Sequence, residues 1–519
     1  MMNIDEGNGL LNQFEKFSSP NKIIDLCINH ARPMTTLIMA LCLALGNAAD
    51  AVEIMCVGFI MTEMQKSDNI STSDKEFLSA AVFLGMLFGG VTCGYLSDIF
   101  GRKYCLLVSL LLNATAGLAS ALSPNIDILI FCRVIGGIGI GGSVPTVFSL
   151  GAEIFPSNVR GKYLSIIAAF WMVGSIYTAL AAWIMLGDNF NGGKILPGVD
   201  WRWFAVVSAL PAVAALVLTY YILPESPRYL VLRNRFEEAA VVLGYLSGVK
   251  VDPQMLSETA ISPTPAEVFN PANNLTPTTV NPMPSAIEYN SRTPSMSSTV
   301  STLKKNSPVS TIAILFEGKI RTNTLILLAI WFSLSFGSYG LSSWISLLYE
   351  DVGMANAYAD SFIYSAATLP GNLLTIGFID LYGRRNMLSI GMCLAGLSVI
   401  GFALDSSQPA VVIISSSLFN CFSVVGWNAL DCLSCESFPT KVRTSAMGLL
   451  AASGRIGAIS AQFVNGSLEK NVPVLLFVTC GCTVMGGLIA RCLPEDPSGQ
   501  SLSFTEENEE DNSLEGGRH

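Results

Sequence analysis

The sequence predicts an all-α membrane protein with about twelve transmembrane helices in two six-helix halves. The first observation is composition, because a chain of 519 residues that is 51% hydrophobic and 13% charged lies outside the usual range of soluble globular proteins. The second is the recurrence of apolar runs of about 20 residues, the length that crosses a hydrocarbon core. The third is a duplicated set of charged signatures, which indicates two copies of one unit.

The apolar runs set the order of the expected helices. The spans expected in the first half are 34–62, 77–97, 104–123, 126–150, 161–186 and 201–223, and those in the second half are 322–349, 358–380, 387–404, 410–434, 444–465 and 472–493. The basic residues of the short loops concentrate on one side of this arrangement. The positive-inside rule makes that side cytoplasmic, and both termini fall there.

The chain is expected to divide into five segments. These are a cytosolic N-terminal segment (1–33), the first six-helix bundle (34–223), a cytosolic linker (224–320), the second six-helix bundle (321–493) and an acidic cytosolic tail (494–519). Within the linker, apolar spacing from Arg228 onward predicts an amphipathic helix against the inner face. The stretch from Val251 to Ser310 is rich in Pro, Ser, Thr and Asn, so we expect it to be disordered.

The sequence offers little for metal, cofactor or catalytic chemistry. Only His30 and His519 are present, and the pair Cys432 and Cys435 has no second pair of ligands at zinc-site spacing. No combination of nucleophile, base and metal ligands is visible. We therefore expect no metal, no cofactor and no enzymatic activity.

The charged signatures carry a resemblance to the major facilitator superfamily. The run Gly94-x-x-x-Asp98-x-x-Gly101-Arg102-Lys103 resembles its loop signature, and a partial copy follows at 380–385. Two further motifs agree with that family, namely Arg133-x-x-x-Gly137-x-Gly139 and Pro224-Glu225-Ser226-Pro227-Arg228. The resemblance implies the major facilitator fold, in which two halves rock about a substrate near the membrane midplane.

One branch of this superfamily is especially similar. It contains synaptic vesicle glycoprotein 2 and its relatives and borders the organic ion transporters. The likeness rests on Asp50-Ala-Val-Glu53, Trp331 to Leu341, Pro370-Gly371-Asn372 and Trp427-Asn428-Ala-Leu-Asp431. The chain departs from the superfamily at Ile376, where the second loop copy would have glycine. It also lacks the paired glutamines of sugar porters in span seven, which makes a hexose a less expected substrate.

The duplicated charges are expected to act as gates. Asp98 and Arg102 lie four residues apart at a helix end, where they can bridge neighbouring helices in one state and release in the other. The same role is expected for the remaining members of the two copies, which are Glu153 with Arg160, Asp380 with Arg384, and Glu436 with Arg443. The alternative is that these charges only set the topology.

Five charges within the spans have no counterpart in the other half. A charge at the membrane centre is costly and usually faces a cavity or a partner. Asp50 resembles the span-one aspartate of proton-coupled porters, which pairs with an arginine of span four, here Arg133. With Glu53 nearby, we expect these residues to couple protons to transport. The alternatives are a static ion pair that joins two helices and, for Glu53, attraction of a cation.

The other two unmatched charges are candidates for substrate binding. Arg455 occupies a place where organic anion transporters resemble this chain, and its guanidinium can bind a carboxylate or phosphate through two hydrogen bonds. The alternative is that it neutralises Asp431 or Glu53. The aromatic residues expected to line the cavity are Trp171, Phe336, Tyr339, Trp344 and Trp427.

Together these features predict a proton-coupled secondary transporter that works by alternating access. The expected substrate is a small organic ion or polar metabolite, with an organic anion preferred. We expect a monomer in the plasma membrane or an endomembrane vesicle, with substrate, protons and the lipid bilayer as partners and no nucleic acid. The alternatives are a facilitative uniporter or exporter of organic cations or sugars, and a non-transporting membrane sensor or interaction protein.

Overall fold

The computed structural model describes residues 20–68, 70–188, 193–261, 315–438 and 440–493. Twelve helical spans in this part are long and apolar enough to cross a membrane, which confirms the predicted fold class. In the first half the helices are α3 (Pro33–Asp68), α4 (Thr72–Phe100), α5 (Arg102–Ala121), α6 (Ile126–Ile154), α7 (Arg160–Leu186) and α8 (Trp201–Ile222). In the second half they are α13 (Gly318–Asp351), α14 (Ala357–Ala366), α15 (Thr368–Tyr382), α16 (Arg384–Leu404), α17 (Pro409–Glu436), α18 (Thr440–Leu468), α19 (Val472–Ile489) and the short η2 (Ala490–Cys492).

The sequence explains where these helices begin and break. Ser71 and Asp74 form a reciprocal capping box that starts α4, and Asp200 caps the start of α8. The span predicted at 358–380 is divided into α14 and α15. Pro370 accounts for the division, because it lacks the N–H that would bond the carbonyl of Ala366.

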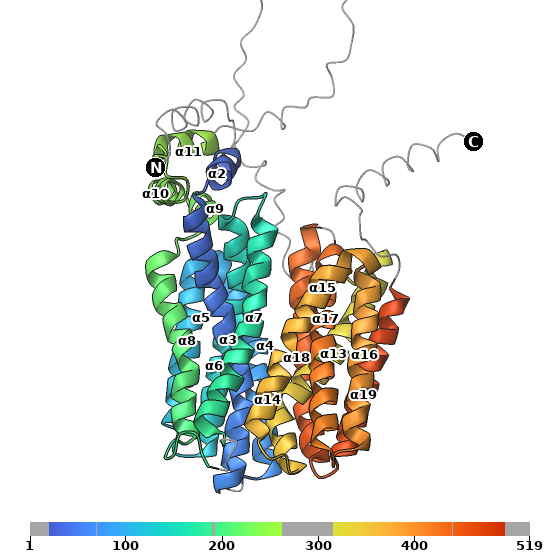
Figure 1. Cartoon of the computed structure of the whole chain (residues 1–519). Coiled ribbons are helices and arrows are strands. Elements are labelled where there is room, and N and C mark those ends of the chain that lie inside the picture. The colour runs from blue at the N-terminus through green and yellow to red at the C-terminus, as the bar shows by residue number, and fades with distance from the viewer. Residues whose placement is uncertain (1–19, 69, 189–192, 262–314, 439, 494–519) are drawn as a thin grey trace, which may run out of the picture.

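The two sets of helices form bundles that stand side by side (Figure 1). The bundles meet where α3 packs on α13, α4 on α18 and α7 on α14. The contact of α3 with α13 is especially close, since a Cβ on Gly58 would collide with the carbonyl of Ser343. Toward the upper end of Figure 1, which carries the duplicated charged loops, the ribbons diverge. The side of the membrane that this end faces stays a prediction.

Four helices outside the spans form a cap on the first half. They are α2 (Pro20–Asn29), α9 (Pro227–Leu232), α10 (Phe236–Ser247) and α11 (Pro253–Ile261), and they pack on one another above α3 (Figure 1). The apolar faces of α2 and α10 meet, which buries Ile24 and Leu243 completely. The predicted amphipathic helix is therefore two helices, separated where Asn234 adopts a left-handed φ of 59°.

The cap corrects one expectation about the linker. The stretch from Val251 was predicted to be disordered, yet α11 is helical and buries Leu256 in the cap. Propensity misled the prediction, because Pro253 is suited to the first position of a helix and the partner α2 lies far away in the sequence. The rest of that stretch, 262–310, lies outside the described residues.

The cap makes a chemical prediction about Cys27 on α2. Its side chain is fully buried, and burial raises the pKa of its thiol to about 12. The thiol therefore stays protonated and shielded at neutral pH. We expect a maleimide to label the exposed Cys492 in the folded protein and to leave Cys27 unmodified until a denaturant is added. Peptide mass spectrometry measures both sites in one sample, and equal labelling without denaturant would contradict the packing of the cap.

Candidate functional site

Asp50 lies in the middle of α3, fully buried and bound only by uncharged groups. The hydroxyl of Ser143 on α6 donates to its Oδ2 at 2.6 Å, and Nδ2 of Asn113 on α5 donates to its Oδ1 at 3.0 Å. Within the described residues, Asp50 takes part in no ion pair. The Oδ1 of Asn113 is buried and has no hydrogen-bond partner in that same part of the chain. Asp50 is thus a carboxyl group without a cation beside it and with a spare acceptor nearby.

Glu53, one turn further along α3, forms a buried ion pair with Arg133 of α6. The two side chains are only 2% and 1% exposed, and Nη1 of Arg133 bonds Glu53 and also reaches Sγ of Cys56 at 3.2 Å. Two glycines make room for the carboxylate. A Cβ at Gly117 would lie 3.3 Å from one Glu53 oxygen, and a Cβ at Gly136 would lie 3.4 Å from the other.

This pairing corrects the predicted partnership of Asp50 with Arg133. Asp50 faces Ser143, and Arg133 lies ten residues earlier on α6, a rise of about 15 Å along the axis. That distance is too long for the two side chains to meet. Glu53 is about 4.5 Å nearer to Arg133 along the antiparallel helix, so it becomes the partner instead.

Arg455 on α18 is partly exposed and lies over the ring of Tyr339, with 5.6 Å between its Cζ and the ring centroid. Its charge interacts electrostatically with Asp50 in the first half and with Asp431 in the second. Neither carboxylate is within ion-pair distance of it. Asp431 is exposed on α17. It forms no ion pair with Arg455 within the described residues, so the alternative that Arg455 neutralises Asp431 by direct contact is not seen there. Arg455 is therefore a cation that lies over an aromatic ring and acts electrostatically on one acid of each half.

The aromatic residues near Arg455 form a connected series. The ring of Tyr339 lies 5.2 Å from Phe83 of the first half and 5.6 Å from Trp427, and Nε1 of Trp427 donates to Ser338 at 3.0 Å. The other predicted wall residues lie elsewhere. Phe336 is buried against Phe332, Trp344 is fully buried and donates to Gln462, and Trp171 packs against the apolar core. Size and apolarity do not distinguish a cavity wall from a core position.

Two amide side chains of the second half form a polar cluster that was not predicted as a candidate site. Nδ2 of Asn428 on α17 donates to Oδ1 of Asn372 on α15 at 3.0 Å and to Thr375 at 3.3 Å. Nδ2 of Asn372 lies 3.4 Å from the sulfur of Met172, which belongs to the first half. The signal was present in the sequence, because polar amides within apolar spans require partners.

The duplicated loops have duplicated geometry. Arg102 bonds Asp98 at 3.0 Å and Glu153 at 3.3 Å, and Arg384 bonds Glu436 at 3.4 Å in the second half. The side chain of Asp380 lies outside the described part. Each of these pairs joins groups within one half.

The predicted pairs of Glu153 with Arg160 and of Glu436 with Arg443 do not form. Arg160 instead donates to the carbonyl of Phe155 at 3.4 Å, and Arg443 donates to the carbonyl of Phe438 at 3.3 Å. Each of these arginines lies at the start of a helix and folds back on the loop before it. The preceding glutamate lies on the adjoining helix and points to Arg102 or Arg384.

At the opposite end of the molecule, polar side chains join the two halves. Lys75 of α4 is 4% exposed and pairs with Glu469 at the end of α18, and Thr72 donates to the same carboxylate at 3.0 Å. A second, exposed pair joins Lys66 to Glu350 at 2.9 Å. We call the contact of Lys75 with Glu469 the latch.

The comparisons with known proteins agree with this architecture. The family model described as Sugar (and other) transporter matches residues 40–263, and the model described as Major Facilitator Superfamily matches residues 361–514. The human protein "Synaptic vesicle glycoprotein 2C" is 27% identical over 91% of this chain and 80% of its own length. "Synaptic vesicle glycoprotein 2B" of Rattus norvegicus is 28% identical over 91% of this chain and 85% of its own.

Solved structures show the same fold. The partially occluded inward open form of the xylose transporter XylE from E. coli superposes with a TM-score of 0.66 at 18% identity, covering 90% of this chain and all of the other. Its inward open form gives a TM-score of 0.65 at 20% identity, with coverage of 91% and 98%. The matched family models thus cover parts of both halves, and the solved relatives match the arrangement of the whole. The chain is thus an integral multi-pass membrane protein whose two halves match the Sugar (and other) transporter and the Major Facilitator Superfamily models, and it resembles synaptic vesicle glycoprotein 2.

Proposed function

We propose that this protein is a proton-coupled symporter of a small organic anion, with Asp50 as the proton site and Arg455 as the anion site. Arg455 carries the proposal, because its charge acts on carboxylates of both halves without a direct ion pair. A guanidinium in that position keeps its paired N–H groups available for a carboxylate of the substrate. The ring of Tyr339 supports the cation without occupying those groups.

The environment of Asp50 suits both of its protonation states. Ser143 and Asn113 donate to the ionised form. If Asp50 takes a proton, the amide of Asn113 can rotate so that its unbonded Oδ1 accepts the new O–H. The buried pair of Glu53 with Arg133 serves as a fixed scaffold in this scheme, since each charge already has its counterion.

The position of Arg455 couples the proton to the anion. While Asp50 is ionised, two carboxylates act on Arg455 and compete with a bound anion. Protonation of Asp50 removes one of them and so strengthens the attraction of Arg455 for the substrate. By linkage, a bound anion then favours the proton on Asp50. The two species bind together, which is the requirement for symport.

The conformation fits one state of an alternating-access cycle. The latch joins the halves at the end that the sequence assigns to the outside. At the charged-loop end, the ion pairs of Arg102 with Asp98 and Glu153 lie within the first half. We assign this structure to the state that is open on the charged-loop side. In this proposal the protein works as a monomer.

A second candidate substrate is an organic cation. Asp431 is exposed one helical turn from Trp427, and a carboxylate beside an aromatic ring can bind a positively charged ligand. In that case Arg455 would repel the ligand, so its removal would increase transport rather than abolish it.

Uptake into proteoliposomes tests the proposal with a panel of organic anions, organic cations and sugars. With an acidic exterior, the wild-type protein is expected to accumulate one or more anions. Asp50→Asn should lose gradient-driven accumulation while it retains exchange of labelled for unlabelled anion. Arg455→Gln should reduce anion uptake by roughly 10- to 100-fold, the loss of one charge-assisted contact. Asp127→Asn, an exposed residue at the start of α6, is the matched control.

The alternatives give different results in the same assay. Gradient-driven uptake that survives Asp50→Asn would rule out Asp50 as the proton site. Higher cation uptake in Arg455→Gln would favour the organic cation. An absence of flux for every compound, in protein with a normal unfolding transition, would overturn transport and favour a sensor.

A further inference from the structure

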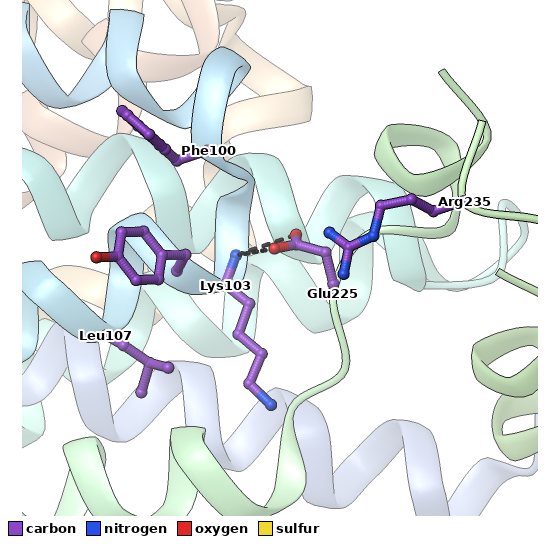
Figure 2. A pocket seen from close by; sticks show the side chains of 6 residues that line it. Phe100, Lys103, Leu107, Glu225 and Arg235 are labelled. Carbon is purple, nitrogen blue, oxygen red and sulfur yellow. Dashed lines mark hydrogen bonds between the residues drawn. The ribbon is translucent and has the colours of Figure 1, made fainter. Parts of the chain in front are cut away.

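A groove of about 330 Å³ lies at the charged-loop end of the first half, away from the interface between the halves (Figure 2). Its lining comes from the end of α4, the first turns of α5, the segment after α8 and the start of α10. The lining residues are Phe100, Lys103, Tyr104, Leu107, Glu225 and Arg235. The groove therefore joins the transmembrane bundle to the cap.

The acidic residue of the groove is already satisfied by the protein. The carboxylate of Glu225 accepts the backbone N–H groups of Arg102 at 2.9 Å, of Lys103 at 3.1 Å and of Ser226 at 2.9 Å. Gly101 has a φ of 104°, and a Cβ there would collide with this carboxylate. The positive end of α5 offsets the charge of Glu225, so the carboxylate opposes a bound anion only weakly.

Two cations border the groove with donors available to a ligand. The Nζ of Lys103 bonds the carbonyl of Tyr220 at 3.1 Å, which uses one of its three protons. Arg235 pairs with Glu238 at 2.7 and 2.6 Å, but both side chains are about half exposed, and such surface pairs exchange readily for another anion. In Figure 2 the guanidinium of Arg235 points toward Glu225, whereas the side chain of Lys103 extends away from that carboxylate and carries Nζ along another part of the lining.

The rim of the groove is apolar and aromatic. Phe100 and Tyr104 of the lining are more than half exposed, and their rings lie 6.1 Å apart. Outside the lining, at the end of α8 whose backbone Lys103 contacts, Tyr220 and Tyr221 are 62% and 79% exposed. Aromatic rings at helix ends are typical of the boundary between hydrocarbon and headgroups. Below Leu107, the surface of α5 continues with exposed apolar side chains such as Leu111, a face suited to acyl chains.

We propose that this groove binds the headgroup of an anionic phospholipid from the surrounding leaflet. Lys103 and Arg235 attract the anionic phosphate, the aromatic rim surrounds the glycerol, and the acyl chains lie along α5. Cationic pockets on the cytoplasmic side of helical bundles suit such lipids, at about 1 kcal/mol for each basic residue. Because Arg235 belongs to the cap and Lys103 to the bundle, the lipid ties the two together. This binding is independent of the transported substrate.

Lipid titration of the purified full chain tests the inference. Delipidated protein in detergent is titrated with phosphatidylglycerol or phosphatidylcholine, and bound lipid is counted by native mass spectrometry. We expect phosphatidylglycerol to bind more tightly, and Lys103→Met and Arg235→Gln each to weaken it about fivefold. Arg235 is an exposed cap residue, so its variant stays informative if Lys103→Met folds poorly. Lys162→Met, an exposed lysine of α7 at the same end, is the matched control and should bind like the wild type.

Three outcomes would overturn the proposal. Equal binding of phosphatidylcholine would remove the role of the anionic group. An equal loss of affinity in Lys162→Met would assign the binding to general surface charge. Displacement of the lipid by equimolar glycerol phosphate would show an anion site that does not need acyl chains.

Discussion

Glu53→Gln is expected to lower the free energy of unfolding by about 3–5 kcal/mol, because it leaves the guanidinium of Arg133 buried without a counterion. Arg133 is 1% exposed, and two of its nitrogens already lack hydrogen-bond partners within the described residues. A neutral amide at position 53 can accept one of its hydrogen bonds but cannot balance its charge. The measurement is chemical or thermal unfolding of the purified protein in detergent.

Two further variants test whether loss of the ion pair between Glu53 and Arg133 causes the lower free energy of unfolding. Glu53→Gln combined with Arg133→Met should recover part of the loss, since the uncompensated charge is gone, and the two single changes should therefore be non-additive. Glu237→Gln on the exposed face of α10 is the matched control for the same substitution. A loss below about 1 kcal/mol in Glu53→Gln, the range of exposed ion pairs, would contradict the buried pair.

Lys75→Met is expected to shift the conformational equilibrium toward the state in which the halves separate at the latch end. The pair of Lys75 with Glu469 joins the halves and is mostly buried, so its stabilisation is specific to the present state. A loss of about 2 kcal/mol would change the ratio of the two states roughly 30-fold. Spin labels on Leu122 and Leu404, both exposed at this end of opposite halves, report the separation as a longer distance component.

The exposed pair of Lys66 with Glu350 provides the internal control for this experiment. It also joins the halves, but both side chains are more than a third exposed, and such pairs contribute about 0–1 kcal/mol. Lys66→Met should therefore leave the distance distribution nearly unchanged. A similar shift in both variants would show that burial of the latch is unimportant. No shift in either variant would show that the latch does not stabilise the present state.

The fold was largely readable from the sequence because it depends on short-range patterns. The length of each span follows from the thickness of the bilayer. The pattern from Asp98 to Arg102 recurs at 380–384, which indicates a duplicated unit even when no contact between residues is known. The geometry preserves that repeat, since Arg160 and Arg443 bond equivalent carbonyls. The lengths and ends of the helices depend on caps and prolines that act locally.

The candidate site was only partly readable, because partners depend on the axial register of helices that are distant in the sequence. The cost of burying charge singled out Asp50, Glu53, Arg133, Asp431 and Arg455, yet it does not state which of them meet. A displacement of one turn between α3 and α6 decides whether Arg133 reaches Asp50 or Glu53. The latch and the amide pair of Asn372 with Asn428 also arise from packing between helices, which no local pattern contains.

The cap has a consequence for biosynthesis. Helix α2 is synthesised before the first span, whereas its partners α10 and α11 follow the sixth. The apolar face of α2, with Ile24 and Cys27, therefore emerges from the ribosome long before anything can cover it. It is covered only when the first half has been completed and its last helix inserted. Closure of the cap thus requires a completed first half but no residue of α13.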